Sequence, residues 1–383
     1  MYVWMYDRRI DLRLFAKERS LFLLGPRQTG KSTLLQHLFP DALYIDLLTS
    51  EVFRQFSSAP ETLRHAINDH QLVVIDEIQK LPNLLDEVQH LIDTRGTRFL
   101  LTGSSARKLR RGRANLLGGR AFFLSLHSLV STEIGFERID ELLQRGGLPG
   151  IVDSPLSWEA LKAYTGTYLR EEIQAEALTR SIGNFARFLD VAAHFNGAQI
   201  NYTKIGRDSE VPPRTVRDFV GILQDTLILH VLPPFRASPT RKLTATDKVY
   251  FFDIGVANAL CGRRSLHQSS AEYGTALEQL VFLELRAAID YLRLDTRLAY
   301  WRTLTGVEVD FLVGDELAIE VKSTRRVGPS DLRSLRAIRK DLTLRQRLLV
   351  CREPYERRTE DGIDIMPVQT FCKRLWQGAL LVP

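Results

Sequence analysis

The sequence predicts an α/β multidomain protein, and three patterns along its 383 residues support that prediction. Short apolar runs, each typical of a buried parallel strand, alternate with helical segments through the first third of the chain. A helix–turn–helix pattern followed by an apolar strand occupies the middle. Alternating strands that form a hairpin, framed by helices, fill the C-terminal part. We expect four domains, at residues 1–135, 136–184, 185–238 and 239–383.

The composition is that of a globular protein, with 44% hydrophobic and 26% charged residues. A formal net charge of +6 hints at an anionic partner. The three cysteines, Cys261, Cys351 and Cys372, are far apart and include no CxxC pair, which argues against a disulfide framework or a zinc site. Because the sequence shows no signal peptide or membrane-spanning pattern, we expect a cytoplasmic protein.

A phosphate-binding loop is predicted near the N-terminus. An apolar strand at residues 21–24 leads into the sequence GPRQTGKS at residues 25–32, and a helical segment follows. This strand–loop–helix context predicts ATP binding, because the glycines let backbone N–H groups point at phosphate oxygens. Lys31 is expected to reach the β- and γ-phosphates, and the Ser32 hydroxyl to ligate Mg²⁺. The predicted nucleotide-binding residues are Gly25, Pro26, Arg27, Gln28, Thr29, Gly30, Lys31, Ser32 and Thr33.

A second apolar run, at residues 72–77, reads LVVIDE and ends in two acids. The acids stand at the carboxyl end of a predicted parallel strand, where open α/β sheets place ligands. We expect Asp76 to hold Mg²⁺ through water and Glu77 to act as the general base that polarises the attacking water. The adjacent acid pair favours ATP hydrolysis over nucleotide binding alone.

Two further features are similar to those of AAA+ ATPases. The strand at residues 98–104 ends in polar residues where these ATPases keep a sensor of the γ-phosphate, for which Ser104 is the first choice and Thr102 the alternative. Arg120 follows two glycines where an AAA+ arginine reaches the ATP of a neighbouring subunit, which would require a homo-oligomer. Alternatively, Arg120 is a surface arginine or pairs with a carboxylate. The basic segment 107–113 either contacts a nucleic-acid backbone or is a solvated loop.

The middle of the chain predicts two modules. Residues 131–181 are expected to be helical and fit the small lid of an AAA+ domain. The next segment predicts a winged helix-turn-helix. Its expected elements are a helix at 185–195, a short strand at 200–206 entering a helix, a turn at 211–213, a helix at 214–223 and a strand at 227–232. Its recognition helix would present Arg214, Thr215 and Arg217 to DNA. Alternatively, this module packs inside the protein or binds another protein.

The C-terminal segment predicts a cluster of charged side chains. A helix from residue 271 carries Glu278, and predicted strands at 306–313 and 317–322 carry Asp310, Glu320 and Lys322. Alternation brings the acids of neighbouring strands together, so Asp310 and Glu320 are expected to hold Mg²⁺ against a phosphodiester while the lysine stabilises charge.

This is the arrangement of the PD-(D/E)xK nucleases. An ordinary exposed strand face is the alternative. In the next predicted helix, Arg333, Arg336 and Lys340 share a face that either follows a phosphate backbone or is solvated.

The chain resembles prokaryotic AAA+ ATPases that carry a C-terminal conserved domain of unknown function. The matching pieces are GPRQTGKS, LVVIDEI, FLLTGSS, GGR, RTV, KVYFFDIG, YGTALEQLVFLEL and VEVDFLV…IEVKS. The C-terminal part is also similar to Holliday-junction resolvases, which implies a restriction-endonuclease-like α/β domain with Glu278, Asp310, Glu320 and Lys322 as its site. Gln279 stands where the family usually has asparagine.

These features lead to two functional hypotheses. In the first, ATP and Mg²⁺ drive a machine that binds DNA and cleaves it, in genome maintenance or in defence against foreign DNA. In the second, the protein is a nucleotide-dependent switch that binds a protein partner through a catalytically inactive nuclease-like domain.

Overall fold

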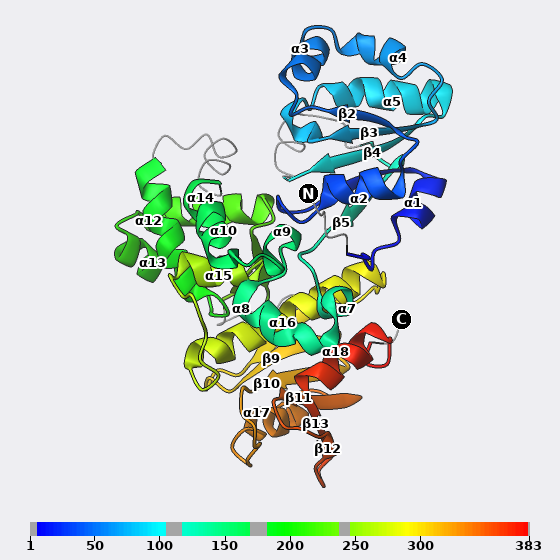
Figure 1. The fold of residues 1–383 in the computed structure, drawn as a ribbon. Helices are drawn as coiled ribbons and strands as arrows, with labels where there is room; N and C mark the ends of the chain where they lie inside the picture. Colours follow the sequence, from blue (N-terminus) through cyan, green and yellow to red (C-terminus); the bar gives the residue numbers. More distant parts are fainter. Residues whose placement is uncertain (1–5, 105–116, 169–181, 237–245, 382–383) are drawn as a thin grey trace. The chain divides into compact units, whose positions relative to one another are not determined.

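The computed structural model describes residues 6–104, 117–168, 182–236 and 246–381 (Figure 1). The chain divides into two compact units, each described here by itself. Unit 1 comprises Met1–Ser128 with Asp225–Ile228, and unit 2 comprises Leu129–Gln224 with Leu229–Pro383. No helix within the described ranges has the length and apolar character needed to cross a membrane.

Unit 1 contains a five-stranded sheet in the order β2-β3-β4-β1-β5, in which every pairing is parallel. This confirms the expected parallel sheet. The carboxyl ends of β1, β3 and β4 are neighbours at one edge of the sheet, because β4 lies between the other two. The strands are β1 (Ser20–Leu24), β2 (Leu43–Asp46), β3 (Leu72–Asp76), β4 (Arg98–Gly103) and β5 (Ala121–Ser125).

Helices cover both faces of this sheet (Figure 1). Phe22, Val73 and Phe99 alternate with residues of the opposite face and pack, fully buried, in one core with Val88 and Leu91 of helix α5 (Leu84–Arg95). The helical elements are α1 (Leu12–Glu18), α2 (Lys31–Leu38), α3 (Ser50–Ser58), η1 (Pro60–Thr62), α4 (Leu63–Ala66), η2 (Ile78–Lys80) and α5 (Leu84–Arg95).

Unit 2 begins with helices, as expected for this part of the chain. They are α7 (Ser131–Ile134), η3 (Phe136–Arg138), α8 (Ile139–Arg145), α9 (Pro149–Val152), α10 (Ser157–Ala163), the π-helical η4 (Tyr164–Tyr168), α12 (Ile182–Ala192), η5 (Ala193–Phe195), α13 (Tyr202–Ser209) and α14 (Pro213–Asp225).

The prediction of a short strand at residues 200–206 is wrong. Helix α13 already begins at Tyr202, because the Asn201 side chain caps it by accepting a hydrogen bond from the Lys204 amide at 2.9 Å. Strand-like pairing in this region is limited to an isolated bridge between Gln199 and Lys248.

A two-stranded antiparallel hairpin follows α14. It pairs β6 (Leu229–Leu232) with β7 (Lys248–Phe251), so the hairpin crosses the predicted boundary at 238/239. Asp253 then caps helix α15 (Ile254–Leu260), since its carboxylate accepts hydrogen bonds from the amides of Val256 at 3.0 Å and Gly147 at 2.7 Å. The Asp253 side chain therefore links the segment that follows the hairpin to the turn between α8 and α9.

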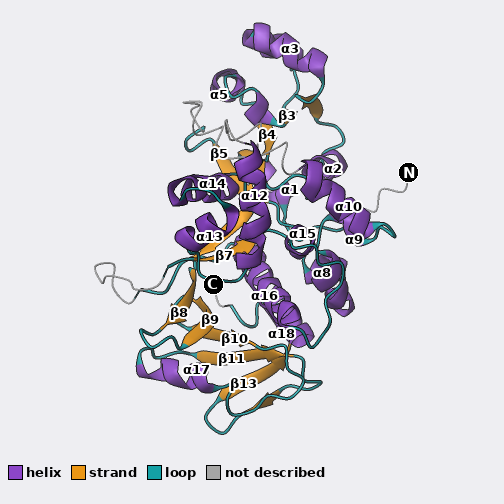
Figure 2. Cartoon of the chain, turned by 90° about the vertical axis from the view of Figure 1, so that its left-hand side faces the viewer, coloured by secondary structure: helices purple, strands orange, loops and turns teal. Residues whose placement is uncertain are grey.

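The C-terminal sheet has six strands in the order β12-β13-β11-β10-β9-β8. The predicted hairpin is present as antiparallel β9 and β10, while β10, β11 and β13 run parallel. Figure 2 shows α16 and α18 on one side of this sheet and α17 on the other. The elements are α16 (Ala271–Tyr291), β8 (Leu298–Arg302), β9 (Glu308–Val313), β10 (Leu317–Val321), α17 (Arg333–Ala337), η6 (Ile338–Lys340), β11 (Gln346–Cys351), β12 (Arg357–Arg358), β13 (Ile363–Pro367) and α18 (Val368–Trp376).

Candidate functional site

The glycine-rich loop between β1 and α2 has the backbone that phosphate binding needs. Gly30, at the N-cap of α2, has φ of +90°, and a Cβ at Gly25 would lie 2.4 Å from the carbonyl oxygen of Leu126. The buried ammonium of Lys31 donates to the carbonyl oxygens of Gly25 at 2.7 Å and Pro26 at 3.0 Å. The loop therefore holds its lysine close to the helix N-terminus, where phosphate is favoured.

The remaining predicted loop residues lie around this lysine. The hydroxyl of Thr29 donates to the carbonyl oxygen of Pro26 at 2.8 Å, and Gln28 has a positive φ of 63°. Ser32 and Thr33 stand on the first turn of α2, half-buried and exposed respectively. These positions agree with a loop whose backbone, rather than its side chains, faces the phosphates.

Asp76 lies at the end of β3 and is held by two hydroxyl groups. Thr102 donates to one carboxylate oxygen and Tyr44 to the other. Burial and the Asp76 carboxylate raise the pKa of Tyr44 well above its ordinary value, while a hydrogen bond with Ser32 opposes them. The Tyr44 phenol is therefore hydrogen-bonded to Asp76 and lies close to Ser32, the two residues predicted to hold Mg²⁺.

Glu77 is buried beside Asp76, in a conformation that is uncommon for this residue type. Its φ of 61° lies in the left-handed region, which costs a non-glycine residue on the order of 1 kcal/mol. The hydroxyl of Thr102 accepts from the Glu77 amide at 2.9 Å, while Gln79 donates to the Glu77 carboxylate and, at 3.1 Å, to the hydroxyl of Ser104. Both predicted sensor residues are thus linked to the acids, Thr102 directly and Ser104 through Gln79.

Arg120 is engaged within its own chain. Its guanidinium forms two hydrogen bonds with the carboxylate of Asp93, Nε to Oδ1 at 2.7 Å and Nη2 to Oδ2 at 3.0 Å. This pairing agrees with the carboxylate-partner alternative, and a role in a neighbouring subunit would require Arg120 to leave Asp93. The basic segment 107–113 lies outside the described residues.

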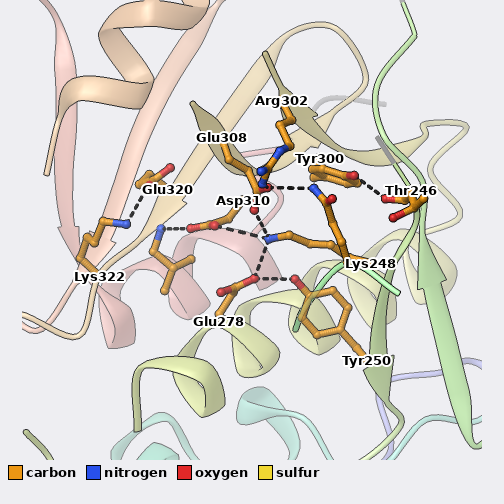
Figure 3. A network of polar contacts seen from close by, with 12 residues as sticks. Thr246, Lys248, Tyr250, Glu278, Tyr300, Arg302, Glu308, Asp310, Glu320 and Lys322 are labelled. Atoms are coloured by element: carbon orange, nitrogen blue, oxygen red, sulfur yellow. Dashed lines mark hydrogen bonds and ion pairs between the residues drawn. The ribbon is translucent and has the colours of Figure 1, made fainter. Parts of the chain in front are cut away.

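Three C-terminal acids gather around Lys248, which was not among the predicted site residues (Figure 3). The Lys248 ammonium lies 2.6 Å from a carboxylate oxygen of Glu308, 3.0 Å from Glu278 and 3.7 Å from Asp310. The Tyr250 hydroxyl donates to Glu278 at 2.6 Å. Strand β7 supplies both Lys248 and Tyr250, whereas the acids come from α16 and β9.

Electrostatics keeps this lysine charged. Burial alone would lower the pKa of Lys248, but Glu278, Asp310 and Glu308 together raise it well above its ordinary value. Burial disfavours the charge of Glu308 too, yet the pKa of that carboxyl lies below its ordinary value because of Lys248 and Arg302. The cluster therefore contains a permanent ammonium ion among its carboxylates.

Asp310 and Glu320 lie at neighbouring positions of β9 and β10, as predicted, but they are engaged separately. Asp310 accepts from the Val321 amide at 2.8 Å, and Glu320 lies 2.5 Å from the ammonium of Lys322. Burial raises the pKa of both carboxyls. Within the described ranges, no group of three or more His, Cys, Asp or Glu side chains is arranged to hold a metal ion.

The side chain of Gln279 points away from the acid cluster. It donates to the carbonyl oxygen of Phe251 at 2.7 Å and accepts from the Asn196 amide at 2.8 Å. Gln279, which stands where the family usually has asparagine, therefore contacts the backbone of β7 and not the acid cluster.

The residues proposed to contact DNA lie on the helical part of unit 2. Arg214 and Arg217 are exposed on α14, Thr215 is half-buried, and the Arg217 guanidinium stacks over the Tyr202 ring at 4.7 Å. On the face of α17 and η6, Arg333 and Lys340 are exposed, and Arg336 pairs with Asp361 at 2.9 Å.

Sequence reasoning missed several residues of these sites, among them Tyr44, Gln79, Lys248 and Glu308. Glu308 had a visible signal, since it precedes Asp310 by two residues in the same alternating strand. Lys248 gave no such signal, because it lies 62 residues before Asp310 along the chain (310 minus 248). All three cysteines are free, and two of them, Cys351 and Cys372, are buried.

Three family models match successive parts of the chain. Residues 17–135 match an AAA domain, residues 136–267 a domain of unknown function (DUF8612), and residues 273–371 another domain of unknown function (DUF4143). The AAA match contains the glycine-rich loop, Asp76, Glu77 and Arg120. The chain therefore carries an AAA-type ATPase domain.

Similar proteins come from two bacterial genera and an archaeon. An uncharacterized protein of Mycobacterium tuberculosis is 27% identical over 342 residues, covering 86% of this chain and 76% of the relative. An uncharacterized protein of Haemophilus influenzae is 23% identical over 385 residues, covering 90% and 92%. A solved signal transduction ATPase with a tetratricopeptide repeat sensor, from Pyrococcus horikoshii, aligns with a TM-score of 0.25 and 12% identity, over 76% of this chain and 52% of that protein. An AAA domain followed by a DUF4143 domain supports a prokaryotic family of AAA-type ATPases for this chain.

Proposed function

We propose that this protein is an ATP-hydrolysing switch in which nucleotide state controls the helical and C-terminal parts of unit 2. The observation that carries the proposal is the convergence of Lys31, Ser32, Asp76 and Glu77 at the carboxyl edge of one parallel sheet. A buried lysine beside a helix N-terminus binds phosphate, and a buried acid pair behind it supports hydrolysis.

The residues present also fit Mg²⁺. The Ser32 hydroxyl and the Asp76 carboxylate both lie beside the Tyr44 phenol, so a Mg²⁺ ion held by Ser32 could reach Asp76 through a bound water. Bound there, Mg²⁺ would neutralise phosphate charge. Glu77, held by Thr102 and Gln79, would orient the attacking water and accept its proton.

The test is ATP turnover by the full chain, measured as phosphate release in the presence of Mg²⁺. Lys31→Ala should lower turnover by about 100-fold or more, because it removes the cation that faces the phosphates. Lys80→Ala, which removes an exposed lysine of the same unit, should leave turnover unchanged. Wild-type protein without turnover, or a Lys31→Ala variant as active as Lys80→Ala, would refute the proposal.

A second candidate function, DNA binding through α13 and α14, has separate support. The two helices are joined by a short turn and precede an antiparallel hairpin, in the order expected of a winged helix-turn-helix. Arg214 and Arg217 are exposed at the start of α14, and Lys204 and Arg207 are exposed on α13. Four exposed cations on adjacent helices suit a phosphate backbone.

Duplex binding measured across a salt series tests this second function. Replacing both Arg214 and Arg217 by alanine should weaken binding and reduce the slope of log affinity against log salt by about 1 for each arginine that binds a phosphate in the wild type. Lys162→Ala on α10, which also removes an exposed cation of unit 2, is the control. Equal affinity and equal slope in the double variant and the control would favour a protein partner.

Metal-dependent DNA cleavage at Glu278, Asp310, Glu320 and Lys322 lacks comparable support. Lys248 contacts Glu278 and Asp310, and Glu320 pairs with Lys322, so the acids as arranged do not fit a divalent ion. In the proposed function, the C-terminal domain therefore has secondary-structure elements similar to those of a nuclease but does not cleave DNA.

A further inference from the structure

The Lys248 ammonium is buried among the carboxylates of Glu308, Glu278 and Asp310. It lies 2.6 Å from Glu308 and 3.0 Å from Glu278, which are the distances of charge-assisted hydrogen bonds, and 3.7 Å from Asp310. Its side chain is only 4% exposed. A buried cation in contact with acids from two different elements is part of the packed interior, unlike an exposed surface ion pair, which contributes little to stability.

Other polar groups around the cluster donate hydrogen bonds to the same three carboxylates (Figure 3). Tyr250 donates to Glu278 at 2.6 Å, Arg302 to Glu308 at 2.7 Å, and the Val321 amide to Asp310 at 2.8 Å. Each acid thus receives a further donor besides Lys248. The protein itself supplies the positive charge and the donors that a divalent ion with bound water would otherwise provide.

Lys248 reaches the cluster from outside the C-terminal sheet. It begins β7, which pairs with β6 of the hairpin, whereas Glu278 belongs to α16 and the other acids to β9. The stacked rings of Tyr250 and Phe282, with centroids 4.2 Å apart, hold the same strand against α16. The ammonium therefore joins the hairpin to both the helix and the sheet.

From these contacts we propose that Lys248 is the built-in cation of the acid cluster and takes the place of a divalent metal. The cluster then keeps the hairpin attached to α16 and β9 without any metal. An ammonium carries a single charge and has no open coordination position, so it cannot activate a water molecule as a divalent ion does. The acids regain a divalent-ion site only when the ammonium is removed.

The experiment measures Mn²⁺ binding to the full chain, purified without nucleotide, by the loss of the free-ion signal in electron paramagnetic resonance. Lys248→Met removes the charge but keeps much of the apolar stem, and it should bind one more Mn²⁺ per chain than the wild type. Mn²⁺ should also raise its melting temperature. Lys248→Arg, which retains a cation, should show neither change. Adding Glu278→Gln to Lys248→Met should abolish the gain.

Two results would overturn the proposal. One is a soluble, folded Lys248→Met variant that binds no more Mn²⁺ than the wild type. The other is Mn²⁺ binding by the wild type that Glu278→Gln eliminates, since the acids would then accept a metal with the lysine in place. This second comparison uses no lysine variant, so it decides the question even if Lys248→Met fails to fold. ATP turnover is a separate measurement, and its outcome does not depend on either result.

Discussion

The hydroxyl of Tyr44 on β2 donates a hydrogen bond to the Asp76 carboxylate on the neighbouring strand β3. Ser32 also lies close to this hydroxyl, so one phenol stands beside both side chains expected to hold Mg²⁺. Tyr44 therefore stands in competition with the metal for these oxygens.

Tyr44→Phe should lower the Mg²⁺ concentration that gives half-maximal ATP turnover. A hydrogen bond to a charged group contributes about 1.5–3 kcal/mol, so its removal should lower the required Mg²⁺ concentration by about 10- to 100-fold. Phenylalanine keeps the ring and its packing. A Mg²⁺ titration at saturating ATP measures the shift, and an unchanged or higher requirement would show that the phenol does not compete with the metal.

Thr102→Val and Ser104→Ala should differ in their effect on turnover. Thr102 is hydrogen-bonded to both acids directly, whereas Ser104 is linked to Glu77 through Gln79. Valine would leave the buried amide of Glu77 and one oxygen of Asp76 without their partner, so turnover should fall by about 100-fold, and less for Ser104→Ala. Thr102→Ser restores the hydroxyl and should recover most of the activity. A larger loss for Ser104→Ala would assign the sensor role to Ser104 instead.

Glu284 predicts a pH dependence of stability. Its carboxylate is fully buried and accepts hydrogen bonds from the Ser131 amide at 2.7 Å and Trp376 Nε1 at 2.6 Å, yet burial raises its pKa from 4.5 to about 7. The folded state thus binds the proton more tightly than the unfolded state. The resulting stabilisation is fully present below pH 4.5 and is lost as the pH rises to 7, a change of about 3 kcal/mol.

Melting temperatures of the wild type and Glu284→Gln between pH 4.5 and 8 measure this effect. The difference between the two proteins isolates Glu284 from other titrating groups, including the nearby Glu133. The wild type should lose stability relative to the variant as the pH rises. Parallel pH profiles would mean that Glu284 titrates at its ordinary value.

Two glycine-to-alanine changes should have opposite signs. A Cβ at Gly255 would lie 2.1 Å from the backbone carbonyl oxygen of Arg145, so Gly255→Ala should destabilise unit 2 by about 1–3 kcal/mol. Gly221, inside α14, has nothing within 4 Å of its added Cβ, so alanine there should stabilise by about 0.5–1 kcal/mol. Thermal unfolding of the wild type and both variants measures these changes in stability. Equal shifts of the melting temperature in the two variants would contradict the packing described here.

The sequence predicted those features that depend on neighbours along the chain. The loop at residues 25–32, the acids that end β3 and the β9–β10 hairpin all follow local patterns, and the structure has each element where it was expected. The predicted short strand before α13 is absent because one capping side chain, Asn201, starts the helix already at Tyr202.

Contacts between distant segments could not be predicted in this way. Tyr44 meets Asp76, and Lys248 meets Glu278, only after strands and helices have packed. Periodicity places a residue on a face, but it does not say which distant side chain faces it. The identity of the cation among the C-terminal acids therefore required the fold.

The most direct test of the central claim is a comparison of ATP binding with a single turnover of ATP in the wild type and in Glu77→Gln. Glutamine keeps the size of the side chain but cannot accept the proton of the attacking water. The account predicts that both proteins bind ATP equally well, and that the wild type forms ADP and phosphate while Glu77→Gln is slower by about 100-fold or more. Equal rates of hydrolysis in the two proteins, or no hydrolysis by the wild type, would contradict it.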